Sequence, residues 1–191
     1  MNNDEIKPNK EWPPDHWSLN QKWATGAIFR ASGGLNFLNE CLEYIHRGGT
    51  DAAYSRSLYV LLSYNVELIL EAYLLLANEQ FKKDERQLRA ALRCKHNHDL
   101  KQLSDKIGKD KLQNINIADV KSEIKNDLKR YVITISNKDK IIVEDLECVR
   151  YDFEKYNKRR DSDFKEAKRM KGEIWNLLNI TKIIMKMLPK Q

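Results

Sequence analysis

The segment "RCKHNHDL", residues 93–100, concentrates side chains that could do chemistry. It holds two of the four histidines, His96 and His98, together with Arg93 and Cys94. A neutral histidine can take the proton from a ribose 2′-hydroxyl while an arginine neutralises the charge growing on the phosphate, so RNA cleavage needs no metal. Arg93 and His98 are therefore candidate catalytic residues, with His96 as a substitute for His98.

The same segment has two other interpretations. His98 and Asp99 can simply open a helix over residues 99–107, with the Asp99 carboxylate accepting from free backbone N–H groups. We favour this helix start over the catalytic pair. The C-x-H-x-H spacing of Cys94, His96 and His98 does not match usual zinc sites, and no fourth ligand lies nearby. We expect no metal and no cofactor.

Composition indicates a folded, mainly helical chain. Of its 191 residues, 41% are hydrophobic and 32% charged, with only seven glycines, so the fold needs few tight turns. This length suits one domain, which we place over residues 19–191, after an extended arm over residues 1–18 that carries Pro8, Pro13, Pro14 and two tryptophans.

The expected location is the cytoplasm, with no membrane contact. Three widely separated cysteines suggest reduced thiols, and the N-terminus lacks the apolar core of a signal peptide. The longest apolar run, residues 58–76, contains Glu67 and Glu71 near its middle, which argues against a membrane helix. These two carboxylates share a stripe with Tyr64. The stripe either faces solvent or forms a polar seam with another helix.

Periodicity predicts an all-α bundle with one small β-hairpin. The hairpin is expected at about residues 130–146, where two β-branched runs flank the turn "NKDK". A capping box at Ser18 and Gln21 predicts the first helix start, and Gly33 with Gly34 predicts a kink or break in that helix. Helices are expected over residues 18–45, 51–79, 84–93, 99–107, 119–130 and 161–188.

A second basic stretch, residues 150–169, interleaves aromatic and cationic side chains. Aromatic stacking beside phosphate-pairing cations is what binding of single-stranded RNA needs, although inward-packed aromatics below a solvated charged face are the commoner outcome. The candidate nucleic-acid-binding residues are Arg150, Tyr151, Tyr156, Lys158, Arg159 and Arg160.

The order of three segments resembles the HEPN superfamily over roughly residues 50–185. These are a central helix "SLYVLLSYNVELILEAYLLL", the connector "HDLKQL", and "VRYDFEKY" before a long closing helix. The resemblance implies a four- or five-helix bundle that is usually dimeric. It also implies either a metal-independent ribonuclease of toxin or phage-defence systems, or a non-catalytic partner of a nucleotidyltransferase.

The resemblance bears on the catalytic pair in two ways. HEPN ribonucleases carry an R-x4-6-H motif, and Arg93 and His98 match its spacing. The family places this motif at the entry to its last long helix, whereas the last helix here has no histidine. We therefore rank a non-catalytic module binding RNA, a nucleotide or a protein first, an endoribonuclease second, and a purely structural interaction protein third. The apolar helix faces and the resemblance both suggest a homodimer.

Overall fold

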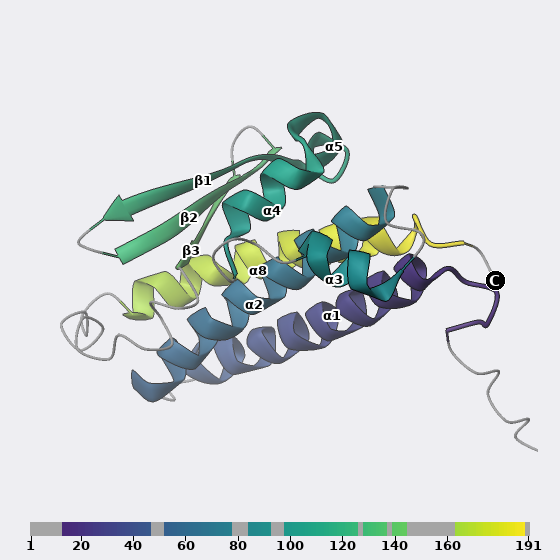
Figure 1. Ribbon diagram of the computed structural model, residues 1–191. Helices are drawn as coiled ribbons and strands as arrows, with labels where there is room; N and C mark the ends of the chain where they lie inside the picture. The colour runs from purple at the N-terminus through teal and green to yellow at the C-terminus, as the bar shows by residue number, and fades with distance from the viewer. Residues whose placement is uncertain are drawn as a thin grey trace, which may run out of the picture.

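The computed structural model describes residues 13–46, 52–77, 84–92, 98–125, 128–136, 139–144 and 163–189. Three long helices lie side by side and form the base of the fold (Figure 1). They are α1 (Leu19–His46), α2 (Ala52–Ala77) and α8 (Asp163–Met185). Helix α2 contacts both α1 and α8, and it also contacts the elements above them. This central place explains why α2 is apolar nearly all round.

Helix α1 begins with the predicted capping box and continues without the predicted break. The Ser18 amide donates to the Gln21 side chain (2.8 Å), and the Gln21 amide donates to the Ser18 hydroxyl (3.3 Å). The predicted kink or break near Gly33 is wrong, because the helix runs unbroken from Leu19 to His46. Gly34 instead makes room for the Asn65 side chain of α2, which lies where a Cβ at this position would be.

Three short helices cover one side of the long ones: α3 (Glu85–Leu92), α4 (Leu100–Ile107) and α5 (Lys109–Gln113). Asp84 accepts from the Arg86 amide at the start of α3 (2.9 Å), and Asp99 caps α4. Gly108, with φ of 89°, ends α4 where the sequence predicted. Helix α5 was not predicted.

The fold is not purely all-α, because a three-stranded antiparallel sheet packs beside α4 (Figure 1). Its strands are β1 (Ile117–Lys125), β2 (Leu128–Ile135) and β3 (Asp139–Glu144), in the order β1-β2-β3. The predicted hairpin is confirmed as β2 and β3, which pair from Ile135↔Asp139 to Arg130↔Glu144. The helix predicted over residues 119–130 is wrong, since residues 119–125 lie in β1 and residues 128–130 lie in β2.

The predicted helix failed because its apolar spacing was ambiguous. Val120, Ile124 and Leu128 recur every four residues, which is close to one helical turn but also two full strand repeats. In the sheet, Val120 is buried opposite Ile133, whereas Ile124 is 81% exposed near the end of its strand. A register shift between Ile117 and Asp119 brings Ile117 and Val120, three residues apart, both into the core.

One apolar core joins the helices to the inner face of the sheet. Strand β2 contributes Tyr131, Ile133 and Ile135 at alternate positions, and all three are buried. Helix α2 contacts β3, and helix α4 contacts β1. Trp17, at the end of the predicted arm, is buried as well, while Trp12 lies outside the described residues.

Candidate functional site

A stripe of three polar side chains crosses the middle of α2. Tyr64, Glu67 and Glu71 follow one another at steps of three and four residues, so they share a helix face. Tyr64 is exposed, Glu67 is buried and Glu71 is partly buried. A carboxylate removed from water needs a charged or hydrogen-bonded partner to remain ionised. The surroundings of Glu67 and Glu71 therefore decide what this stripe can do.

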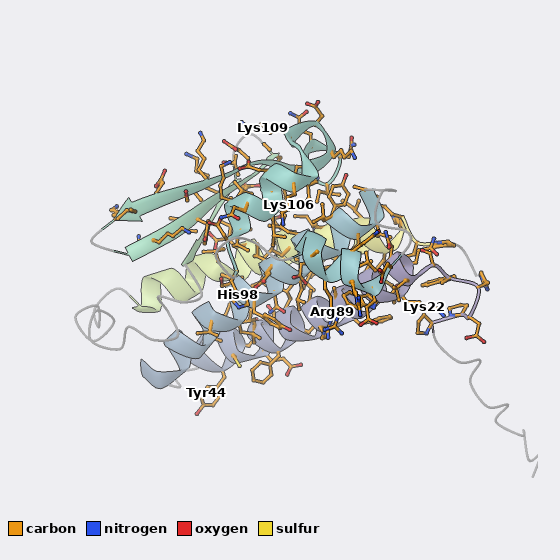
Figure 2. The ribbon with its side chains drawn as sticks, in the orientation of Figure 1. Lys22, Tyr44, Arg89, His98, Lys106 and Lys109 are labelled. Atoms are coloured by element: carbon orange, nitrogen blue, oxygen red, sulfur yellow. The ribbon has the colours of Figure 1, made fainter. Side chains whose placement is uncertain are left out.

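The partner of Glu67 is His98. The Nδ1 atom of His98 lies 2.8 Å from Oε1 and 2.7 Å from Oε2 of Glu67. An ionised carboxylate can only accept, so Nδ1 then carries the proton and donates it to Glu67. The His98 side chain is 34% exposed and that of Glu67 only 10%. The ring is thus anchored on its buried side by α2 and reaches solvent on its other side, and Figure 2 shows it beside that helix.

The first residues of α4 position His98 and continue the polar network. His98 has φ of 67°, a left-handed conformation that turns the chain into the helix. Asp99 accepts from the Gln102 amide (3.1 Å) and from Lys129 Nζ of β2 (3.1 Å). Burial alone would raise the pKa of Asp99, but these hydrogen bonds and the Lys129 charge outweigh it and hold the pKa below its ordinary value.

Glu71 lies one turn beyond Glu67 and behaves differently. Burial, and then the neighbouring charge of Glu67, raise the pKa of Glu71 to about 7, against opposing effects of Arg30 and His98. Burial also raises the pKa of Glu67, although the His98 hydrogen bond and charge partly offset it. Near neutral pH, the Glu71 carboxyl group can therefore gain or lose a proton while the protein stays folded.

The site is an acidic cluster around one imidazole. Glu67, Glu71 and Asp99 supply three carboxyl groups, against which stand His98, Arg30 and Lys129. Glu71 can exchange a proton near pH 7, and the hydrogen bonds of Glu67 and Asp99 link α2, α4 and β2. Within the described residues, no group of three or more His, Cys, Asp or Glu side chains is arranged to hold a metal ion.

The structure places only part of what the sequence singled out. His98 stands at the start of α4, as the helix-start interpretation required, and Asp99 is the cap. The polar-seam alternative for Glu67 is the correct one, since His98 pairs with it. The remaining candidates lie outside the described residues: Arg93, His96, Arg150, Tyr151, Tyr156, Lys158, Arg159 and Arg160.

Two cations of this network were missed by the sequence reasoning. Arg30 is forty-one positions before Glu71, and Lys129 is thirty after Asp99. Neither belongs to a local motif, because both are brought in by packing of distant elements. The only available signal was the expectation that buried carboxylates in an apolar helix require cationic partners.

No family model, curated protein or solved structure matches this chain. One helical segment, Val60–Ala77, is long and apolar enough to cross a membrane by length and composition alone. Two thirds of that window (67%) is buried inside the protein, as in the core helix of a soluble protein, so this is weak support for a membrane span. The fold and the site thus define a mainly helical domain with a small antiparallel sheet and an acidic, histidine-containing seam.

Proposed function

We propose that the chain is a HEPN-like helical domain that works as a non-catalytic binding module for RNA or a nucleotide. The observation that carries the non-catalytic part is the charge around His98. Its ring is paired with Glu67, and Glu71 and Asp99 lie close by. A phosphodiester brought to this ring would be repelled by the carboxylates of Glu67 and Asp99, and Lys129, the cation beside Asp99, is already paired with that carboxylate (3.1 Å). His98 is better suited to join α4 to α2 than to act on RNA.

The binding part rests on the basic balance of the chain. The formal net charge is +6, and residues 82–111 and 150–171 each hold an excess of Lys and Arg. Among the described residues of the first stretch, Arg86, Arg89, Lys106 and Lys109 are exposed (Figure 2 labels the last three). Some of these cations form ion pairs with carboxylates on the surface. Arg89, for example, pairs with Glu85 (2.6 Å). The unevenly spread surplus is the kind of charge distribution that attracts a polyanion.

A salt titration tests binding to RNA. Fluorescence anisotropy with a labelled single-stranded RNA should show an affinity that falls as salt rises, because bound cations release counterions from the phosphates. Replacing Lys158, Arg159 and Arg160 with alanine should weaken binding and reduce the logarithmic salt slope by about 2 if all three contact phosphate. The matched control, alanine at the exposed Lys121, Lys125 and Lys140, removes the same charge from the sheet and should change less.

Two results would contradict this proposal. An RNA affinity too weak to measure at low salt would favour the other class of partner, a protein such as a nucleotidyltransferase, or a purely structural role. Equal losses in the two triple variants would mean that only net charge matters, and that residues 158–160 form no specific surface.

The second candidate function is a metal-independent endoribonuclease. One observation favours it: Glu67 orients His98 through Nδ1, and within the described residues no hydrogen bond engages Nε2. A general base needs this arrangement, in which one ring nitrogen is held and the other is available. His98 would take the 2′-hydroxyl proton and Arg93 would bind the phosphate, with His96 as the substitute base. Glu67→Gln should then slow cleavage, because it removes the charge that stabilises the protonated ring.

A further inference from the structure

The outward face of α1 carries an ordered stripe of glycine, aromatic and charged residues. We define the α1 stripe as Gly26, Arg30, Gly33, Phe37, Glu40 and Tyr44, which recur at steps of three or four residues and so lie on one face. Phe37 is 57% exposed and Tyr44 58%. The opposite face of α1, with Ala24, Ala27, Ala31, Leu35 and Leu38, is buried in the core. The stripe therefore lies away from the apolar core, and its two large aromatic side chains are exposed for more than half of their surface.

Two features of the stripe depart from an ordinary solvated helix face. Phe37 and Tyr44 lie two turns apart on the same face of one helix, and together they offer an exposed apolar strip to a partner. Gly26 and Gly33 also sit on this face, and nothing lies within 4 Å of the place where their Cβ atoms would be. Each glycine thus leaves a shallow depression that a large side chain from outside could fill.

The spacing of these residues is self-complementary. Consider a second α1 helix lying antiparallel on the first. The two-fold axis passes between the two stripes at the height of Leu35 along the helix, while the Leu35 side chain itself faces the core. Phe37 and Gly33 each lie two residues from that point, about 3 Å along the axis, so each Phe37 meets Gly33 of the partner subunit. Tyr44 and Gly26 each lie nine residues away, about 14 Å, so each Tyr44 meets Gly26 of the partner subunit.

The charges agree with the same register. Arg30 and Glu40 each lie five residues from Leu35, on opposite sides, so two Arg30–Glu40 ion pairs form across the interface. Knobs therefore meet depressions and opposite charges meet in a single arrangement. A two-fold interface requires this property, because the same surface must fit itself.

We propose that the α1 stripe is the interface at which two copies of this chain associate, as an antiparallel two-fold pair about Leu35. The interface is formed mainly by one helix from each subunit and is correspondingly small, so we expect a weak dimer that forms in a concentration-dependent way. The arrangement also places Arg30, which lowers the pKa of Glu71, at the contact between subunits. The proposal does not depend on whether the domain binds RNA.

Sedimentation equilibrium over a concentration series, from micromolar to several hundred micromolar, tests the charge pairing. Glu40→Arg should raise the dissociation constant at least about tenfold, because it brings two like charges together twice in each dimer. The double variant Arg30→Glu with Glu40→Arg should restore it to within about threefold of the parent. Glu123→Arg, on the exposed part of β1, is the control and should leave association unchanged.

Disulfide trapping tests the register itself. Cys94 and Cys148 are first replaced with serine, while Cys41 is kept, since burial raises the pKa of its thiol and lowers its reactivity. An equal mixture of Gly26→Cys and Tyr44→Cys proteins should then give mainly the mixed disulfide. Two copies of position 26 would lie about 27 Å apart, far beyond the roughly 7 Å that a disulfide can bridge.

Three outcomes would overturn the proposal. The first is a chain that stays monomeric at every concentration, as it would if another segment of the same chain covered the stripe. The second is a dimer whose dissociation constant does not respond to Glu40→Arg. The third is efficient linkage of Gly26→Cys to itself, which would require parallel helices.

Discussion

At the scale of single residues, Glu67, Glu71 and His98 form a network with unequal partners. Glu67 has an imidazole within 2.8 Å, and Asp99 has both a backbone N–H and the Lys129 ammonium. Glu71 has no hydrogen bond within the described part of the chain, and the nearby charge of Arg30 only partly offsets its burial. Among the three carboxyl groups, Glu71 is therefore the one whose ionisation is least favourable in the folded protein.

This imbalance predicts how stability changes with pH. In the unfolded chain Glu71 ionises near its ordinary pKa of 4.5, whereas in the fold its pKa is about 7. The folded state thus holds the proton longer, and the contribution of Glu71 to stability falls as pH rises from about 4.5 to 7. Above pH 7 the full loss is present, and it amounts to at most about 3 kcal/mol.

Glu71→Gln should remove this loss. Urea unfolding at pH 8 should show the variant to be more stable than the parent by about 1–3 kcal/mol, and the difference should shrink toward pH 5. Glu123→Gln, at an exposed position on β1, is the control and should show no such dependence. A Glu71→Gln protein that is less stable than the parent at pH 8 would mean that ionised Glu71 has a stabilising partner.

At the scale of elements, the contact between α1 and α2 depends on one glycine. Gly34 faces Asn65, whose amide is buried and has no hydrogen-bond partner among the described residues. A buried amide without partners is unfavourable, so the helices are held by apolar packing around it and not by this side chain. The glycine that seemed to predict a break serves helix packing instead.

Two glycine substitutions separate helix propensity from packing. Gly34→Ala should destabilise the protein by about 1–3 kcal/mol, because the new methyl group would lie well inside 3.0 Å of the Asn65 side chain. Gly172→Ala, in α8 with open space around it, should stabilise by up to about 1 kcal/mol through helix propensity.

Chemical denaturation of both proteins measures these effects. Adding Asn65→Ala to Gly34→Ala should recover most of the loss, because it removes both the clash and the unpaired amide. If Gly34→Ala and Gly172→Ala were equally stabilising, α1 and α2 would not approach as closely as the structure places them.

The elements also show which parts of the sequence were informative. The helix starts at Ser18 and Asp99 and the end at Gly108 were predictable, because capping chemistry is local. The hairpin was predictable from two β-branched runs. Strand β1 was not, because a four-residue apolar spacing satisfies both periods, and only pairing with β2 decides between them.

At the scale of the whole molecule, packing assembled the site from separate elements. The sequence identified Glu67, Glu71 and His98 as notable, but not that Glu67 and His98 touch, since they are 31 positions apart. Arg30 and Lys129 entered the network only through the placement of α1 and β2 around α2. An interaction between distant segments leaves no spacing pattern in one sequence.

The two proposed interaction surfaces lie on different sides of the molecule. Tyr44 of α1 is labelled at the bottom of the fold as drawn, and Lys109 of α5 is labelled at the top (Figure 2). Association of two copies through α1 would therefore leave the labelled lysines of α4 and α5 uncovered. A dimer could then present two basic surfaces to one polyanion, which strengthens binding through a higher effective concentration.

Incubation of the purified protein with labelled tRNA and total RNA in EDTA distinguishes a binding module from a ribonuclease in one experiment. Each sample is read on a native gel for binding and on a denaturing gel for cleavage, alongside folded His98→Ala and Arg93→Ala proteins. A non-catalytic binding module predicts a shifted band, intact RNA, and little change in either variant. Cleavage by the parent protein that both substitutions abolish would contradict the account and make His98 a catalytic base.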